Sequence, residues 1–184
     1  VGKDFYIKKK LEMNNVQIID YIEKEKSVFR VFLKQIRLHQ WSKNLLLFIP
    51  GLASHQLIIP SIFFNSLKGF IAFSLLASSV YVLNDIVDVG YDRKHPKKKS
   101  RPIAAGDISI FNAYALMLLC FISGVLLAAN LGIAFLFVGS LYIILNILYS
   151  FYLKKFIILD VIILMSFYTF RLLAGHIPDS IPLS

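Results

Sequence analysis

Three aspartates in the stretch from Asn84 to Gly106 have the residue type and the spacing to hold a metal ion. Asp85, Asp88 and Asp92 are three and four residues apart, so on a helix they share a face and can converge on one point. They follow an apolar run, at a helix end whose dipole disfavours negative charge, so they should resist ionising together unless a cation binds. Such carboxylates suit Mg²⁺, which keeps waters and shares its shell with substrate phosphates. Asn84 adds a neutral oxygen donor.

Six cationic side chains follow these aspartates at once: Arg93, Lys94, Lys97, Lys98, Lys99 and Arg101. They offer charge-assisted hydrogen bonds to phosphate oxygens. A metal beside these cations predicts a substrate that carries a diphosphate. The alternative is a solvated loop whose charges balance one another and fix topology. The regular spacing of the acids disfavours it, since topology needs no aspartates on a shared helical face. Gly90 is expected to end or bend the helix, so that Asp92 needs the cation to draw it in.

Composition places the chain in a membrane. Its 184 residues are 57% hydrophobic, with a mean hydropathy of +0.68. Repeated apolar runs of bilayer-crossing length favour helical spans over a β-barrel. The lone Cys120 excludes a disulfide framework within this chain. The net charge of +9 belongs to basic residues that border apolar runs, which indicates anionic lipids and phosphorylated substrates rather than nucleic acid.

Residues 1–27 are mostly polar and predict a cytoplasmic tail or the end of a preceding, fused or separate, soluble domain. Residues 28–43 predict an amphipathic helix along the membrane interface, because apolar side chains recur at helical spacing with Lys34, Gln35 and Arg37 opposite. Its apolar face comprises Val28, Phe29, Phe32, Leu33 and Ile36. The five predicted spans cover about residues 44–60, 64–84, 108–129, 132–151 and 156–174. Pro50-Gly51 should kink the first span.

Charge placement predicts the orientation of these spans. On this path all but two of the 20 Lys and Arg residues, Lys68 and Arg171, fall on one side of the membrane. The positive-inside rule makes that side cytoplasmic, together with the N-terminus and the aspartate loop, in a multi-pass protein of the cytoplasmic (inner) membrane. Arg171 falls within the fifth span, where an ionisable group usually faces the bundle interior or a wet cavity. Snorkelling, or a partner outside this chain, is the alternative.

The aspartate stretch resembles the first motif of the UbiA superfamily of intramembrane prenyltransferases. That motif reads Asn-Asp-x-x-Asp-x-x-x-Asp, as in residues 84–92, and Arg101-Pro102 with Gly106 is similar to its Arg-Pro-x-x-x-Gly continuation. The upstream RLHQWSKNLLLF, the insertion His95-Pro96 and the segment YSFYLKKFIILDVIILMSFYTFRLLAG look most like the decaprenyl-phosphate phosphoribosyltransferase branch. In that branch a Lys, an Asp and an Arg recur in this order.

The resemblance implies an all-α membrane protein, a partial UbiA-type helical bundle with about five of an expected nine transmembrane helices. Residues 28–184 would form the N-terminal part of that domain. A second acidic motif, in a later cytoplasmic loop of the superfamily, has no counterpart here, because Asp160 stands alone and Asp179 falls on the opposite side. The activity of this chain by itself is therefore in doubt.

The resemblance also implies a Mg²⁺-dependent transferase acting on a polyprenyl lipid and a phosphorylated co-substrate. Asp85, Asp88 and Asp92 would hold the metal and, with Arg101, form the catalytic set. The residues expected to bind the diphosphate are Lys43, Asn84, Lys98, Lys99, Lys154 and Arg171. The branch implies transfer of 5-phosphoribosyl from phosphoribosyl diphosphate to polyprenyl (decaprenyl) phosphate. The superfamily alone implies polyprenyl transfer to an aromatic acceptor such as 4-hydroxybenzoate. A non-catalytic transporter half or scaffold is the remaining alternative.

Overall fold

The computed structural model describes residues 27–153 and 157–178, except the side chains of residues 157, 158 and 160. The predicted tail at 1–27 lies almost wholly outside them. The described residues form helices without strands. The long helices are α4 (Pro60–Val87), α7 (Ile110–Asn130), α8 (Ile133–Phe151) and α9 (Ile157–His176). The short ones are α2 (Val28–Gln35), η1 (Leu38–Phe48), α3 (Ile49–Ala53), α5 (Val89–Lys94), η2 (Lys98–Ser100) and α6 (Pro102–Ala105).

Of the described helices, α4, α7 and α8 are long and apolar enough to cross a membrane. With 28 residues and a rise of about 1.5 Å per residue, α4 is about 42 Å long. The hydrocarbon core of a bilayer is only about 30 Å thick. One end of α4 therefore extends beyond the lipid tails, and the aspartates lie at its C-terminal end.

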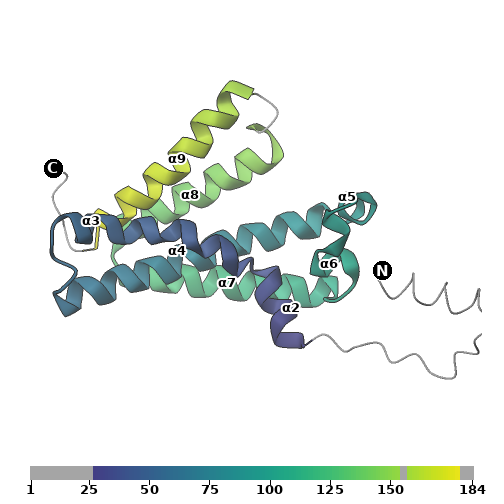
Figure 1. Ribbon diagram of the computed structural model, residues 1–184, viewed down its shortest axis with the longest axis horizontal. Helices are drawn as coiled ribbons and strands as arrows, with labels where there is room; N and C mark the ends of the chain where they lie inside the picture. Colours follow the sequence, from purple (N-terminus) through teal and green to yellow (C-terminus); the bar gives the residue numbers. More distant parts are fainter. Residues whose placement is uncertain (1–26, 154–156, 179–184) are drawn as a thin grey trace, which may run out of the picture.

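Helix α4 is the central element of the bundle. It packs along its length against α7, which returns antiparallel to it, while η1 lies along another side and α8 and α9 form a hairpin that leans away (Figure 1). The α7–α8 turn is tight and uses Gly132 at φ 107°, a conformation that a side chain disfavours. The main apolar cluster joins η1, α4, α7, α8 and α9 through Leu47, Ala72, Phe73, Ala77, Ala128, Phe135, Tyr142, Ile163, Phe167 and Ala174.

Two glycines let helices approach closely. A Cβ atom at Gly124 of α7 would lie 2.8 Å from Cδ2 of Leu76 in α4. At Gly175 of α9 a Cβ atom would collide with the carbonyl oxygen of Leu47 in η1. Small residues at helix crossings are typical of membrane bundles, where close van der Waals contact replaces the hydrophobic effect.

The first span, predicted over about residues 44–60 with a kink at Pro50-Gly51, differs in its bounds from the helices found there. The helix there begins earlier, as the 3₁₀ segment η1, continues as α3 and ends at Ala53. A polar turn with His55 at φ 58° then leads to Pro60, whose fixed φ suits the first turn of α4. A 3₁₀ helix rises about 2.0 Å per residue, so these 16 residues cover about 30 Å, close to the thickness of the lipid core.

The prediction for the amphipathic helix needs two corrections. It ends at Gln35 rather than at 43, because Arg37 turns the chain at φ 54°. Its buried side carries Val31 and Gln35, whereas Phe29 is 70% exposed. Lys34 is exposed, whereas Gln35 and Arg37, which were also assigned to the solvent side, face the bundle. Polarity alone misassigned them, because a buried carboxylate on α4 is their partner.

Candidate functional site

Asp85, in the last turn of α4, is buried and accepts three hydrogen bonds. Its Oδ1 atom accepts from Nη2 of Arg37 at 2.6 Å and from Nη1 of Arg101 at 3.0 Å. Its Oδ2 atom accepts from Nε2 of Gln35 at 3.0 Å. Two of these donors, Gln35 and Arg37, come from the N-terminal side of α4, and the third, Arg101, comes from the loop that follows it. They offset the cost of burying a carboxylate that is only 3% exposed.

Arg101 joins two of the three aspartates. Its Nη1 atom also donates to Oδ2 of Asp92 at 2.7 Å, and Nζ of Lys98 lies 3.9 Å from Oδ1 of the same carboxylate. Arg101 precedes Pro102, which starts α6 and holds the preceding residue in an extended conformation. The side chain can therefore reach both acids.

The expectation that Gly90 breaks the helix, and that Asp92 needs a bound cation to turn inward, was wrong. The break is at Asp88, the residue between α4 and α5, with φ −86° and ψ 3°. Helix α5 then continues for one and a half turns and points Asp92 inward, where it is 1% exposed. Arg101, a cation supplied by the chain itself, already holds it there.

Asp88 differs from the other two acids. It is half-buried, and its carboxylate makes no hydrogen bond or ion pair with any residue that the structure describes. It lines a pocket of about 180 Å³ together with Asp85. The whole lining comprises Arg37, Asn84, Asp85, Val87, Asp88, Lys98, Arg101, Tyr149, Ser150 and Phe151. This pocket, called the acid pocket below, therefore offers a carboxylate without a bonding partner next to three cationic side chains.

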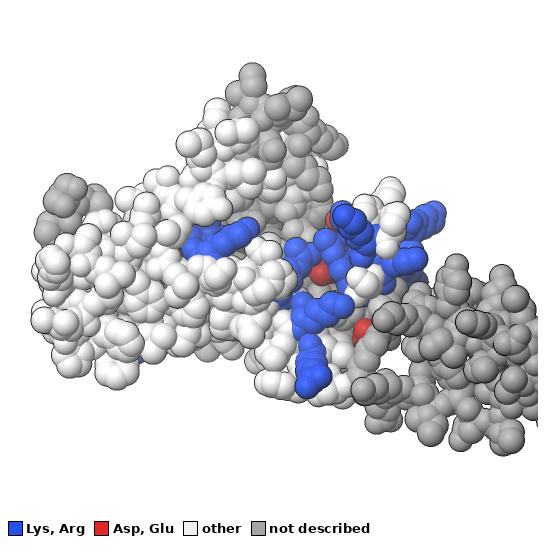
Figure 2. Space-filling view, in the orientation of Figure 1, with Lys and Arg blue, Asp and Glu red and all other residues white. Residues whose placement is uncertain are grey.

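The C-terminal end of α8 forms one wall of the acid pocket. Nδ2 of Asn84 donates to Oγ of Ser150 at 2.9 Å, which ties the end of α4 to that of α8. The basic side chains gather on one end of the molecule, around α2, α5 and α6, whereas most of the rest of that face is uncharged (Figure 2). An anionic ligand would thus be drawn to the end that carries the acid pocket.

The acidic side chains match a Mg²⁺ site in chemistry but are not gathered around one point. No group of three acidic, His or Cys side chains that could hold a metal is found within residues 27–153 and 157–178. However, Asp85 and Asp92 both bind one nitrogen of Arg101, so a cationic group already lies between two hard oxygen ligands. Asp88 opens onto the same pocket. The residues therefore fit Mg²⁺, provided that one of the arginines on Asp85 gives up its place.

The other predicted diphosphate-binding residues are not all brought together. Lys98 lines the acid pocket, whereas Lys99 and Lys43 are exposed and outside its lining. Lys154 lies outside the described residues.

Arg171 lies in a second polar cluster, away from the acid pocket. It is 4% exposed and donates from Nε to Oδ1 of Asn44 at 2.7 Å, from Nη2 to the hydroxyl of Tyr142 at 3.0 Å and from Nη1 to the carbonyl of Phe167 at 2.6 Å. Asn44 in turn donates to Oγ of Ser74 at 2.8 Å. The cluster joins η1, α4, α8 and α9. Arg171 therefore faces the bundle interior, as the cost of a charge in lipid requires.

Sequence reasoning missed Gln35 and Arg37 as hydrogen-bond donors to Asp85. Both were taken for the solvent side of an interfacial helix. A signal was available, because two polar side chains that flank a helix end beside an apolar face can also dock on a buried acid. Only the contact between α2 and the end of α4, 48 to 50 residues away in the sequence, identifies that acid.

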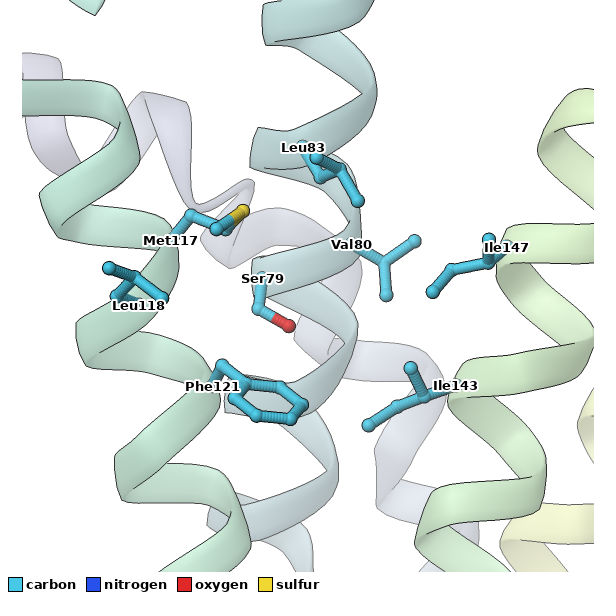
Figure 3. Close-up of a pocket in the computed structure, with 8 residues that line it drawn as sticks. All are labelled: Ser79, Val80, Leu83, Met117, Leu118, Phe121, Ile143 and Ile147. Carbon is cyan, nitrogen blue, oxygen red and sulfur yellow. The ribbon is translucent and has the colours of Figure 1, made fainter. Parts of the chain in front are cut away.

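A second pocket, of about 250 Å³, opens between α4, α7 and α8 and is almost wholly apolar. Ser79, Val80 and Leu83 of α4 face Phe121 of α7 and Ile143 of α8 across it (Figure 3). The hydroxyl of Ser79 donates to the carbonyl of Leu76, so no free polar group enters the space. Such a lining suits hydrocarbon rather than a polar ligand.

Known proteins share this sequence and fold. The profile of the UbiA prenyltransferase family matches residues 45–177. Decaprenyl-phosphate phosphoribosyltransferase of Mycolicibacterium smegmatis is 36% identical over 167 residues, which cover 86% of this chain and 51% of that protein. Protein y4nM of Sinorhizobium fredii is 34% identical over 187 residues, which cover 100% of this chain and 36% of that protein.

A solved structure of digeranylgeranylglyceryl phosphate synthase superposes with a TM-score of 0.70 at 24% identity, over 82% of this chain and 53% of that one. The chain thus spans between about a third and a half of the length of these relatives. The family match, the shared fold and the apolar helices agree with one another. The chain belongs to the UbiA prenyltransferase family and is an integral membrane protein with part of a UbiA-type helical bundle.

Proposed function

We propose that the protein is a Mg²⁺-dependent membrane transferase that moves a 5-phosphoribosyl group from phosphoribosyl diphosphate to a polyprenyl phosphate such as decaprenyl phosphate. The observation that carries this proposal is the acid pocket, in which Asp85 and Asp88 line the same space as Arg37, Lys98 and Arg101. Carboxylates next to cations suit a metal-bound diphosphate. The name of the mycobacterial relative supports the choice of donor and acceptor.

Asp85, Asp88 and Asp92 would hold the metal in this reaction, and Asn84 would lie beside the diphosphate. When bound, Mg²⁺ neutralises negative charge on the diphosphate. Lys98 and Arg101 would stabilise the charge that develops on the leaving diphosphate, where preorganised cations are most effective. The bond between the ribose carbon C1 and the diphosphate oxygen breaks, and its electron pair leaves with the diphosphate. An oxygen of the polyprenyl phosphate forms the new bond to the oxocarbenium-like carbon.

The polyprenyl tail would remain in the membrane. The apolar helix faces and the apolar pocket between α4, α7 and α8 offer hydrocarbon surroundings close to the aspartate-bearing end of α4. Tail and head group would thus meet where α4 leaves the lipid. We assign Lys43 and Lys99 a weaker, longer-range attraction for the head group, since both are exposed.

We propose that the aspartate loop and the N-terminus face the cytoplasm. The basis is the one-sided distribution of Lys and Arg, which the positive-inside rule converts into an orientation. A cysteine introduced at Lys99 should react with a membrane-impermeant maleimide in inside-out vesicles and be protected in right-side-out spheroplasts. The reverse pattern would contradict this orientation.

A second candidate is transfer of an allylic polyprenyl diphosphate to an aromatic acceptor such as 4-hydroxybenzoate. The family, which is one of prenyltransferases, favours it, and the same acids and cations would serve the diphosphate. Labelled phosphoribosyl diphosphate with polyprenyl phosphate, and labelled polyprenyl diphosphate with 4-hydroxybenzoate, should be supplied in parallel to the protein in nanodiscs. We expect product from the first pair alone. Product from the second pair alone would replace the phosphoribosyl assignment with prenyl transfer.

A further inference from the structure

Arg37 has a backbone conformation that is unusual for a residue with a side chain. It lies between α2 and η1 at φ 54° and ψ 50°. L-residues other than glycine, asparagine and aspartate rarely adopt this left-handed conformation, and it persists only where surrounding contacts impose it. Such outliers gather at binding and switch sites. The contacts that impose this one therefore need to be identified.

Those contacts hold the turn against α4, next to the acid pocket. The guanidinium of Arg37 donates to Oδ1 of Asp85 at 2.6 Å and lies over the ring of Tyr81, 4.9 Å from its centroid. The side chain is 24% exposed and lines the acid pocket. On the other side of the turn, Oγ of Ser78 donates to the carbonyl of Ile36 and accepts from Nε1 of Trp41. Both sides of the turn are thus fastened to α4.

The neighbouring Gln35 is only half satisfied. Its Nε2 atom donates to Oδ2 of Asp85, but its buried Oε1 atom has no hydrogen-bond partner among the described residues. A buried oxygen without a hydrogen-bond partner costs free energy. The conformation in which Gln35 holds Asp85 therefore includes this cost. With Gln35 on Oδ2 and Arg37 and Arg101 on Oδ1, three donors occupy the carboxylate of Asp85, and Oδ1 already accepts two hydrogen bonds.

A cation that binds Oδ1 of Asp85 must therefore displace a donor. Gln35 is buried behind the carboxylate and outside the pocket lining, so its bond can persist. Arg37 and Arg101 are the donors on the side of the pocket. Arg101 also holds Asp92, whereas the only carboxylate that Arg37 contacts among the described residues is that of Asp85. Arg37 is the donor that can leave at the smaller cost.

We propose that Arg37 is a ligand-binding residue that exchanges partners. It pairs with Asp85 in the empty site, and its guanidinium passes to the phosphate oxygens of the ligand when a divalent cation takes its place on the carboxylate. The planar guanidinium suits this exchange, because it binds carboxylate and phosphate oxygens with the same paired geometry. This inference rests on the proposed diphosphate site and adds a residue that the aspartate motif does not contain.

Calorimetric titration of the 184-residue chain in phospholipid nanodiscs tests the exchange, with MgCl₂ alone and then with inorganic pyrophosphate at saturating MgCl₂. In Arg37→Gln we expect Mg²⁺ to bind about tenfold tighter, since the competing charged hydrogen bond to Asp85 is lost from the ligand-free site. Pyrophosphate should bind about tenfold more weakly, since one charged hydrogen bond to phosphate is lost from its complex. The matched control is Arg30→Gln, which removes the same charge from an exposed position of α2 outside the acid pocket. There both affinities should stay within about twofold, because exposed charges are screened by salt.

Tighter Mg²⁺ binding together with weaker pyrophosphate binding would indicate exchange. A purely structural role of Arg37 would instead weaken the binding of both ligands. Arg37→Gly provides a second variant whose backbone accepts φ 54° without strain, so the same pair of changes there excludes misfolding as their cause. Weaker Mg²⁺ binding in both variants, or unchanged pyrophosphate binding, would overturn the exchange. Failure of the unaltered chain to bind Mg²⁺ at all would instead overturn the proposed function.

Discussion

The acid pocket and the Arg171 cluster both hold buried charge in one bundle, but they satisfy it differently. At the acid pocket, arginines meet carboxylates at the surface of a cavity, and one aspartate lacks a partner among the described residues. In the Arg171 cluster, the hydrogen-bond acceptors of the arginine among the described residues are neutral oxygens, those of Asn44, Tyr142 and Phe167, and its exposed fraction is 4%. Ion pairs beside a cavity can be exchanged for a ligand. Neutral acceptors deep in a bundle hold an arginine in place.

The comparison assigns ligand binding to the first region and helix packing to the second. Four substitutions, in three experiments, test that division, from the largest expected effect to the smallest.

Asp88→Ala should lower turnover by about a thousandfold or more, because loss of a metal-binding or charge-stabilising group typically costs two to three orders of magnitude or more. The thermal unfolding midpoint should change little, because the described residues make no bond to this carboxylate. Product formation from labelled donors and a thermal melt measure the two effects. Asp107→Ala, an exposed aspartate outside the pocket lining, is the control. Turnover equal to that of the control would contradict a metal site that includes Asp88.

Arg171→Ala should have the opposite profile. It removes the donor of three hydrogen bonds and leaves their acceptors buried, which should destabilise the protein by about 3 kcal/mol. A lower thermal unfolding midpoint in detergent, with nearly unchanged Mg²⁺ affinity below that midpoint, is the expected result. Thr169→Ala, at an exposed position on the same helix, should melt like the unaltered protein. An Arg171 variant that is stable but no longer binds pyrophosphate would move this arginine into the substrate site.

Lys98 and Lys99 provide the smallest contrast. Lys98→Gln should weaken pyrophosphate binding by about tenfold, because its ammonium lines the acid pocket close to Asp92. Lys99→Gln should weaken it by less than about threefold, since an exposed charge acts mainly through a screened field. Titrations at two ionic strengths separate the direct contact of Lys98 from the long-range attraction of Lys99, because salt should reduce only the long-range attraction. Equal losses of pyrophosphate affinity in the two variants would mean that the lining of the acid pocket does not identify the lysine that contacts pyrophosphate.

The sequence identified the aspartates and the membrane character because both are local patterns. Asp85, Asp88 and Asp92 are separated by helical spacings, and α7 and α8 are continuous apolar runs that end at a glycine turn or a polar loop. The structure brings Asp85 and Asp92 onto one guanidinium and Asp88 onto the same pocket as Asp85. The role of these residues in binding a metal remains a prediction.

The parts that the sequence did not predict depend on distant partners. Arg171 binds Asn44, 127 residues away, and the local sequence around either residue does not predict this contact. Gln35 and Arg37 were placed toward solvent, since a polar residue on an amphipathic helix usually lies there. The helix breaks at Asp88 instead of Gly90, and α5, which follows the break, carries the Asp92 that binds Arg101. In each case a specific buried bond outweighed a local preference.

Electron–nuclear double resonance with Mn²⁺ substituted for Mg²⁺ tests the central claim most directly. Mn²⁺ and pyrophosphate should be added to the chain in nanodiscs, and phosphorus-31 couplings recorded on the protein-bound ion. The account predicts one class of bound Mn²⁺ that is coupled to phosphorus and lost in Asp88→Asn. Bound Mn²⁺ without phosphorus coupling, or the same signal after all three aspartates are changed to asparagine, would contradict a metal-bound diphosphate at the end of α4.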